Sequence, residues 1–237
     1  MTLRSRSVQS PLYPIGLRSD HIAEFERLLW IEPKYDPASA DEYIIKFDSD
    51  DSTLITVTGK CYYRNRPVRE FRDASGLPMF EVRRGGWHWL TPAWRIRLPG
   101  NETGHLACVK PVGWRSEFDL TFRNALAPDV KNDDEKMVTL EVRYASPFCG
   151  FGIWVGGRKV ADVRQSMERN RTIRSMLGGP SYNPPRAIME VLVADGFDFS
   201  LASLCAIILC DEHFRSTPPS IFETQERAKR LNPKMVS

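Results

Sequence analysis

Hydrophobic and polar residues alternate along most of the chain between residues 53 and 144. Ile55 and Val57 alternate with threonines, and Phe80 and Val82 alternate with charged residues. The same period of two recurs in three later segments, formed by Trp94, Ile96 and Leu98, by Phe118, Leu120 and Phe122, and by Val138, Leu140, Val142 and Tyr144. This period is typical of strands with one buried and one wet face. Turn sequences between the segments therefore predict an antiparallel sandwich or barrel.

One later segment is apolar on nearly every side. It runs from Phe199 to Cys210, and Asp198 stands before it as a natural N-cap. Its length of about twelve residues is well below the roughly 20 that cross a bilayer. A helix that is apolar all round must be buried inside protein. In a chain of strands, this predicts a barrel wrapped around the helix.

The two ends of the chain have different patterns. Residues 1–41 are predicted to be a tail with a short amphipathic helix, because Ile22, Phe25, Leu28 and Leu29 recur at helical spacing before Pro33. We expect that helix to dock on the main body, and a partner-binding helix is the alternative. Residues 215–237 are predicted to be a helical C-terminal tail.

Three segments resemble a known family. They are Asp73–Phe80, Gly157–Arg164 and, most specifically, Glu190–Glu212 with its strand, turn and apolar helix. These segments are similar to the LURP-one-related branch of the tubby C-terminal-like superfamily, which is distantly similar to phospholipid scramblases. The resemblance covers residues 42–214. It implies a mainly β fold, a closed antiparallel barrel of about twelve strands around a central buried hydrophobic helix, flanked by short terminal helices.

The resemblance also bears on ligands. Tubby proteins bind phosphoinositides, so the superfamily suggests an anionic phospholipid headgroup as ligand. The basic residues that hold the lipid in tubby do not align with particular positions of this chain, and the resemblance therefore names no site residue.

Charge adds a feature that the total conceals. The 237 residues carry a net charge of only +3. Residues 60–100 hold nine basic and three acidic side chains, and residues 150–186 hold seven and two, so two arginine-rich blocks of +6 and +5 lie in a nearly neutral chain. Whether the blocks meet in space decides which partners they can bind, and the small total does not favour nucleic acid.

The first block offers the candidate ligand-binding residues. Arg83, Arg95 and Arg97 alternate with apolar residues and should point outward from the barrel, and Arg84 lies beside them. Guanidinium groups suit phosphate because they donate two parallel hydrogen bonds. The alternative is a solvated barrel face with dispersed charge. The second block, which we expect in a solvated strand and loop, contains Arg158, Lys159, Arg164, Arg169, Arg171 and Arg174.

Catalytic and metal motifs are weak. There is no Gly-x-Ser-x-Gly elbow, and we interpret Cys149 as a packed thiol. The four histidines lack metal-ligand spacing, so no metal and no cofactor is expected. Five scattered cysteines without a CxxC pair favour reduced thiols in the cytoplasm or nucleus.

The sequence therefore predicts a non-enzymatic, cytoplasmic binding module, peripheral at a membrane or bound to an acidic protein partner. The rivals are a signalling adaptor that binds protein through its terminal helices and a scramblase-like membrane protein.

Overall fold

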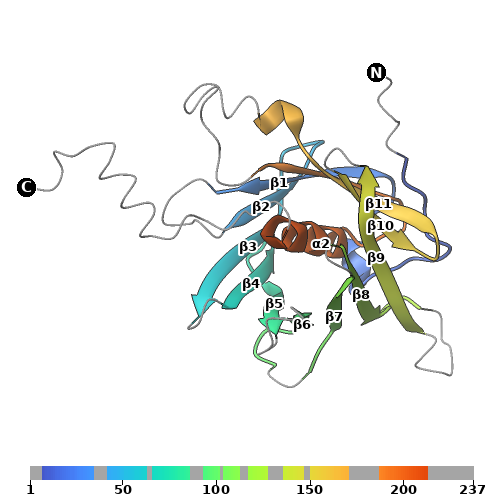
Figure 1. Cartoon of the computed structure of the whole chain (residues 1–237). Helices are drawn as coiled ribbons and strands as arrows, with labels where there is room; N and C mark the ends of the chain where they lie inside the picture. The colour runs from blue at the N-terminus through green and yellow to red at the C-terminus, as the bar shows by residue number, and fades with distance from the viewer. Residues whose placement is uncertain are drawn as a thin grey trace, which may run out of the picture.

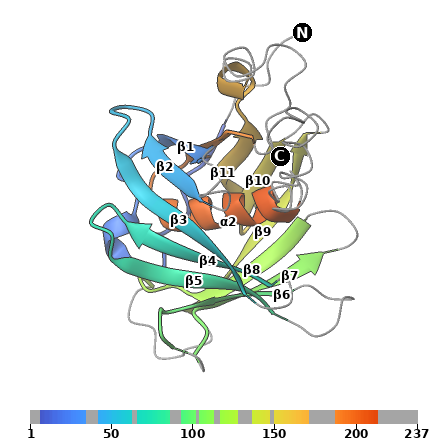
Figure 2. The same cartoon turned by 90° about the vertical axis from the view of Figure 1, so that its left-hand side faces the viewer.

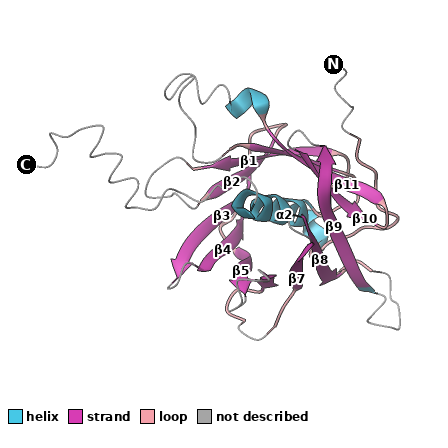
Figure 3. Ribbon diagram, in the orientation of Figure 1, coloured by secondary structure: helices cyan, strands magenta, loops and turns pink. Residues whose placement is uncertain are grey.

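The computed structural model describes residues 7–34, 42–62, 66–85, 93–101, 104–112, 117–127, 136–146, 150–170 and 187–212. This part of the chain consists mainly of strands, with a single long helix (Figure 3). The predicted C-terminal helical tail, residues 215–237, lies outside the described residues.

Twelve strands form the body of the protein. In chain order they are β1 (Arg27–Pro33), β2 (Tyr43–Phe47), β3 (Thr53–Tyr62), β4 (Arg66–Asp73), β5 (Pro78–Gly85), β6 (Ala93–Arg97), β7 (Ala107–Val112), β8 (Glu117–Arg123), β9 (Met137–Ser146), β10 (Gly150–Val155), β11 (Arg158–Gln165) and β12 (Met189–Val193). A short 3-10 turn, η1 (Ser19–His21), precedes them, and the helix α2 (Phe199–Glu212) follows them.

The strands close into one antiparallel barrel. Each strand pairs with its neighbours in sequence, and β1 pairs with β12 to complete the ring, with Leu29 opposite Val191. Closure leaves no exposed sheet edge, which removes a site of unwanted strand pairing. The predicted fold class, a closed antiparallel barrel of about twelve strands, is confirmed.

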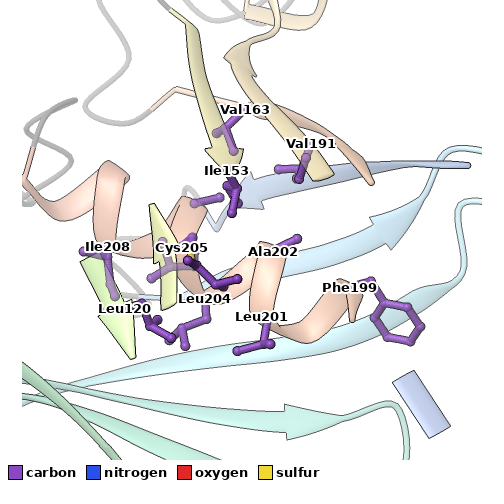
Figure 4. Close-up of a cluster of buried hydrophobic side chains, with 14 of the residues drawn as sticks. Leu120, Ile153, Val163, Val191, Phe199, Leu201, Ala202, Leu204, Cys205 and Ile208 are labelled. Atoms are coloured by element: carbon purple, nitrogen blue, oxygen red, sulfur yellow. The ribbon is translucent and has the colours of Figure 1, made fainter. Parts of the chain in front are cut away.

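Helix α2 lies inside the ring of strands in two views at right angles (Figures 1 and 2). Every residue from Phe199 to Cys210 is buried. Inward side chains of several strands surround the helix, among them Leu120, Ile153, Val163 and Val191 (Figure 4). This packing explains why the segment is apolar on all sides, since no face of the helix meets water.

The start of α2 is capped as the sequence predicts. One carboxylate oxygen of Asp198, Oδ1, accepts hydrogen bonds from the backbone N–H groups of Ser200 and Leu201 at 2.7 and 3.2 Å. The other oxygen accepts from the backbone N–H groups of Leu17 at 2.9 Å and Arg18 at 3.4 Å. One buried side chain therefore caps the helix and anchors the N-terminal segment.

The predicted amphipathic helix within residues 1–41 is wrong. The region from residue 19 onward forms η1 and then β1, so the barrel begins before residue 42. The helical spacing put Phe25 on the apolar face, yet Phe25 is 55% exposed. Leu29, Trp30 and Ile31 are all buried, because β1 packs against the core on one face and is covered by other side chains on its outer face. A run buried on both faces lacks the period of two that reveals a strand.

Candidate functional site

The arginines of the first block lie on two neighbouring strands. In the register of β5 and β6, Arg83 stands opposite Arg95, and Glu81 stands opposite Arg97. Val82 and Ile96, which alternate with them, are 1% and 0% exposed. The expectation that Arg83, Arg95 and Arg97 point outward is therefore confirmed, and we call these three residues the arginine face.

Arg84 belongs to β5 and pairs in register with Trp94. Its side chain lies outside the described part of the chain, as do residues 86–92, so the place of Arg84 in the candidate site stays a prediction.

The three arginines differ in how far their charge is neutralised. Arg83 donates from Nε and Nη2 to Oε2 of Glu81, at 3.0 and 2.7 Å. Arg95 is exposed, and no described residue forms an ion pair with it. Arg95 therefore presents a charge that no described acid compensates, and Arg83 contributes a guanidinium that is already engaged by Glu81.

Arg97 has a neutral partner. Its Nε donates to Nδ1 of His105 at 3.2 Å, which requires that nitrogen to carry a lone pair. Local desolvation, together with the charges of Arg97 and Arg95, lowers the pKa of His105. The histidine therefore stays neutral near pH 7 and accepts from Arg97 without cancelling its charge.

The register places two like charges directly opposite each other. Arg83 and Arg95 are cross-strand neighbours, and Cys108 of β7 follows Arg95 in the same row. Like charges in this relation destabilise a sheet by a few tenths of a kcal/mol up to about 1 kcal/mol. An anion between the two guanidinium groups would remove that repulsion, so the row is chemically suited to phosphate.

The second arginine-rich block is largely engaged in the structure. Nitrogens of Arg164 and Lys159 lie 2.6 and 3.8 Å from Oδ2 of Asp162, whose side chain is fully buried. Arg169 pairs with Glu32 at 2.5 Å and stacks over Trp30, 3.9 Å from the ring centroid. These cations complete the outer packing of the barrel, whereas Arg171 and Arg174 lie outside the described residues.

The described parts of the two blocks do not merge. In the ring, β5 and β11 are separated by five strands in either direction, so the two basic segments lie on opposite sides of the barrel. In Figure 2, β5 and β6 run along the lower side and β11 lies above α2. The second block therefore adds no charge to the arginine face, and any anion that binds there is attracted by Arg83, Arg95 and Arg97 alone among the described residues.

One buried arginine, Arg69, was not singled out from the sequence. Arg69 of β4 points into the barrel and is 3% exposed, and it forms an ion pair with Asp211 at the C-terminal end of α2. The signal was present, because Arg69 stands two residues before Phe71, a core residue of the same strand. Residues two apart share a face, so the same alternation assigns Arg69 to the interior.

Among the described residues, no cluster of three or more histidine, cysteine, aspartate or glutamate side chains is arranged to hold a metal ion. Within the same part of the chain, no helix is long and apolar enough to pass through a bilayer.

A family model described as LURP-one-related matches residues 28–211, which spans the barrel from β1 to the end of α2. No curated protein shows significant similarity to the chain.

Proposed function

The chain belongs to the LURP-one-related family, and on this premise we propose that it is a non-enzymatic binding module whose arginine face binds anionic phospholipid headgroups at a membrane surface in the cytoplasm. Arg95 is the observation that carries the proposal. It is exposed, it has no ion-pair partner among the described residues, and it stands beside Arg83 and Arg97 on the same outer face.

The chemistry of guanidinium supports a phosphate ligand. Arginine donates in a planar fork that matches two phosphate oxygens, and it is less strongly hydrated than lysine. Each basic residue near an anionic membrane contributes about 1 kcal/mol of attraction. Two or three arginines therefore give weak, salt-sensitive binding, as expected of a peripheral protein.

The main alternative is a signalling adaptor that binds protein through its terminal helices. The N-terminal helix that this adaptor would use is absent from the described residues, because Arg27–Pro33 form a strand of the barrel in its place. A scramblase-like protein would need α2 to leave the barrel, although residues Phe199–Cys210 are buried there.

Vesicle flotation tests the proposal. We expect the wild-type protein to float with vesicles that contain phosphatidylserine or phosphoinositide and to stay unbound with phosphatidylcholine alone. Arg95→Glu/Arg97→Glu should lower binding at least about 10-fold, because it replaces two attractive charges with repulsive ones. Arg158→Glu is the matched control, since Arg158 is an exposed arginine on the far side of the barrel. Equal, negligible flotation with anionic and neutral vesicles would overturn the proposal.

A further inference from the structure

The exposed large apolar side chains gather at one end of the barrel. This end holds the β2–β3, β4–β5, β6–β7 and β10–β11 turns, the first residues of β1 and β9, and the start of α2, and we call it the turn end. The segment before η1 also lies here, because the Ile15 N–H donates to the Gly196 carbonyl just before α2. In Figure 2 the β2–β3 and β4–β5 turns point to the left. Seven large apolar residues are exposed in the described part of the chain. Of these, only Met167 lies at the opposite end of the barrel, where it follows the last residue of β11. The six at the turn end are Leu12, Tyr13, Phe25, Leu77, Leu98 and Met137.

Leu77 is held outward by a rigid turn. The Oδ1 atom of Asp73 accepts from the backbone N–H of Leu77 at 3.0 Å, and the Asp73 N–H donates to the Leu77 carbonyl at 3.0 Å. Gly76 supplies the left-handed backbone that the turn requires, with φ of +85°. With its backbone fixed in this way, the Leu77 side chain remains 64% exposed.

Leu98 is held in the same manner on the next turn. The alternation of β6 predicts a buried position, but the strand ends at Arg97 and Leu98 is 48% exposed. The Leu98 carbonyl accepts from the Asn101 N–H at 3.1 Å, and the Oδ1 of Asn101 accepts from the Gly104 N–H at 2.9 Å. The position of Leu98 is therefore fixed by a hydrogen-bonded turn.

These two turns flank the strands that carry the arginine face. Leu77 immediately precedes β5, and Leu98 immediately follows β6. At about 3.3 Å per residue, Arg97 lies about 3 Å and Arg95 about 10 Å along the strand from Leu98. The headgroup layer on each side of a bilayer is about 5–7 Å thick. Leucines at the top of the acyl region would thus place guanidinium groups among the phosphates.

We propose that the protein docks on an anionic bilayer through the β4–β5 and β6–β7 turns, with the side of the barrel formed by β5 and β6 tilted toward the membrane and the β10–β11 turn on the far side tilted away from it. In this orientation Leu77 and Leu98 insert below the headgroups while the arginine face contacts them. This rests on the proposed function and adds an orientation and an apolar contribution to it. The occupant is a bilayer because the two leucines project on separate convex turns beside cations, and a fluid apolar layer under anionic groups complements both features.

The test compares two apolar variants. Leu77→Ser/Leu98→Ser should bind anionic vesicles about 10-fold more weakly for each leucine lost, since each buries about half of a leucine side chain in the acyl boundary. Its preference for anionic over neutral vesicles should remain, and its insertion pressure into an anionic lipid monolayer should fall. Met167→Ser, which removes an 81% exposed methionine at the opposite end, should match the wild type in both measurements.

The outcomes separate the two proposals. If the wild type binds anionic vesicles and the leucine variant binds them equally, with an unchanged insertion pressure, the docking orientation is wrong and headgroup binding by the arginine face stands. If the wild type binds no vesicle, both proposals fail. If the leucine variant loses the binding of a protein partner while vesicle binding is unchanged, the turn end is a protein interface and the docking proposal is wrong.

Discussion

Arg69 and Asp211 form a two-pronged ion pair inside the barrel, where Nε and Nη2 of the arginine lie 3.1 and 2.6 Å from the two carboxylate oxygens. Their side chains are 4% and 9% exposed. Asp211 stands near the C-terminal end of α2, where the helix dipole disfavours a negative charge. Arg69 therefore compensates an acid that the helix itself would destabilise, and it joins the helix to β4.

Breaking this pair should destabilise the barrel strongly. Asp211→Asn leaves a buried guanidinium without its counter-charge, and Arg69→Met leaves a buried carboxylate. Each should lower the free energy of unfolding by about 3–5 kcal/mol, measured by urea denaturation.

The double variant Arg69→Met/Asp211→Leu is the control, because it removes both charges together. We expect it to recover much of the loss, since well-packed apolar residues often replace a buried ion pair without cost. Single variants within about 0.5 kcal/mol of the wild type would show that the pair does not stabilise the fold.

Asp198 predicts an unusual dependence of stability on pH. Burial raises the pKa of this carboxyl group to about 6, against the opposing effect of hydrogen bonds from Ser200, Leu17 and Leu201. In the unfolded chain the pKa is near 3.8. The folded state therefore binds the proton of Asp198 more tightly than the unfolded chain does. The stabilisation of the fold by this proton is complete below about pH 3.8 and is lost as the pH rises through 6.

Asp198→Asn isolates this effect because the variant cannot titrate at residue 198. The wild-type free energy of unfolding, minus that of the variant, should fall by about 2–3 kcal/mol between pH 4 and 7. His21, whose pKa burial lowers, produces an opposite slope that both proteins share. A difference that is constant with pH would contradict the raised pKa.

Gly16 packs closely against Asp198, so a larger residue at this position should clash with it. A Cβ atom on Gly16 would lie 2.8 Å from Cδ1 of Ile22 and 2.9 Å from Cβ of Asp198. Gly16→Ala should therefore lower the free energy of unfolding by about 1–3 kcal/mol, as overpacking does elsewhere. Gly76→Ala tests a different cost in open space, because its turn needs a positive φ. An unchanged thermal midpoint in Gly16→Ala would show that the N-terminal segment moves aside easily.

Leu204 tests the position of the helix. Its side chain is fully buried on α2, so Leu204→Asp places an unpaired charge inside the barrel at a cost of several kcal/mol, comparable to the whole stability of a domain. Circular dichroism and gel filtration should show an unfolded or aggregated protein, whereas Met167→Asp, at an exposed residue, should remain folded. A folded, monomeric Leu204→Asp protein would refute the burial of the helix.

The strands could be predicted where one face is wet, because segments such as Phe118–Phe122 alternate cleanly. The strand β1 could not, since Leu29, Trp30 and Ile31 are buried on both faces and the remaining apolar residues happen to recur at helical spacing. The outward direction of Arg95 followed from alternation alone. The engagement of Arg83 by Glu81 required the register and side-chain geometry, and the exposure of Leu98 required knowing that β6 ends one residue earlier.

The central claim is that the arginine face and the turns that carry Leu77 and Leu98 contact an anionic membrane. Hydrogen exchange of the vesicle-bound protein tests it most directly. With phosphatidylserine-containing vesicles, we expect exchange to slow in residues 74–85 and 93–101, and to be unchanged in residues 156–165 on the far side of the barrel. Protection confined to 156–165, or no change anywhere despite bound vesicles, would contradict it.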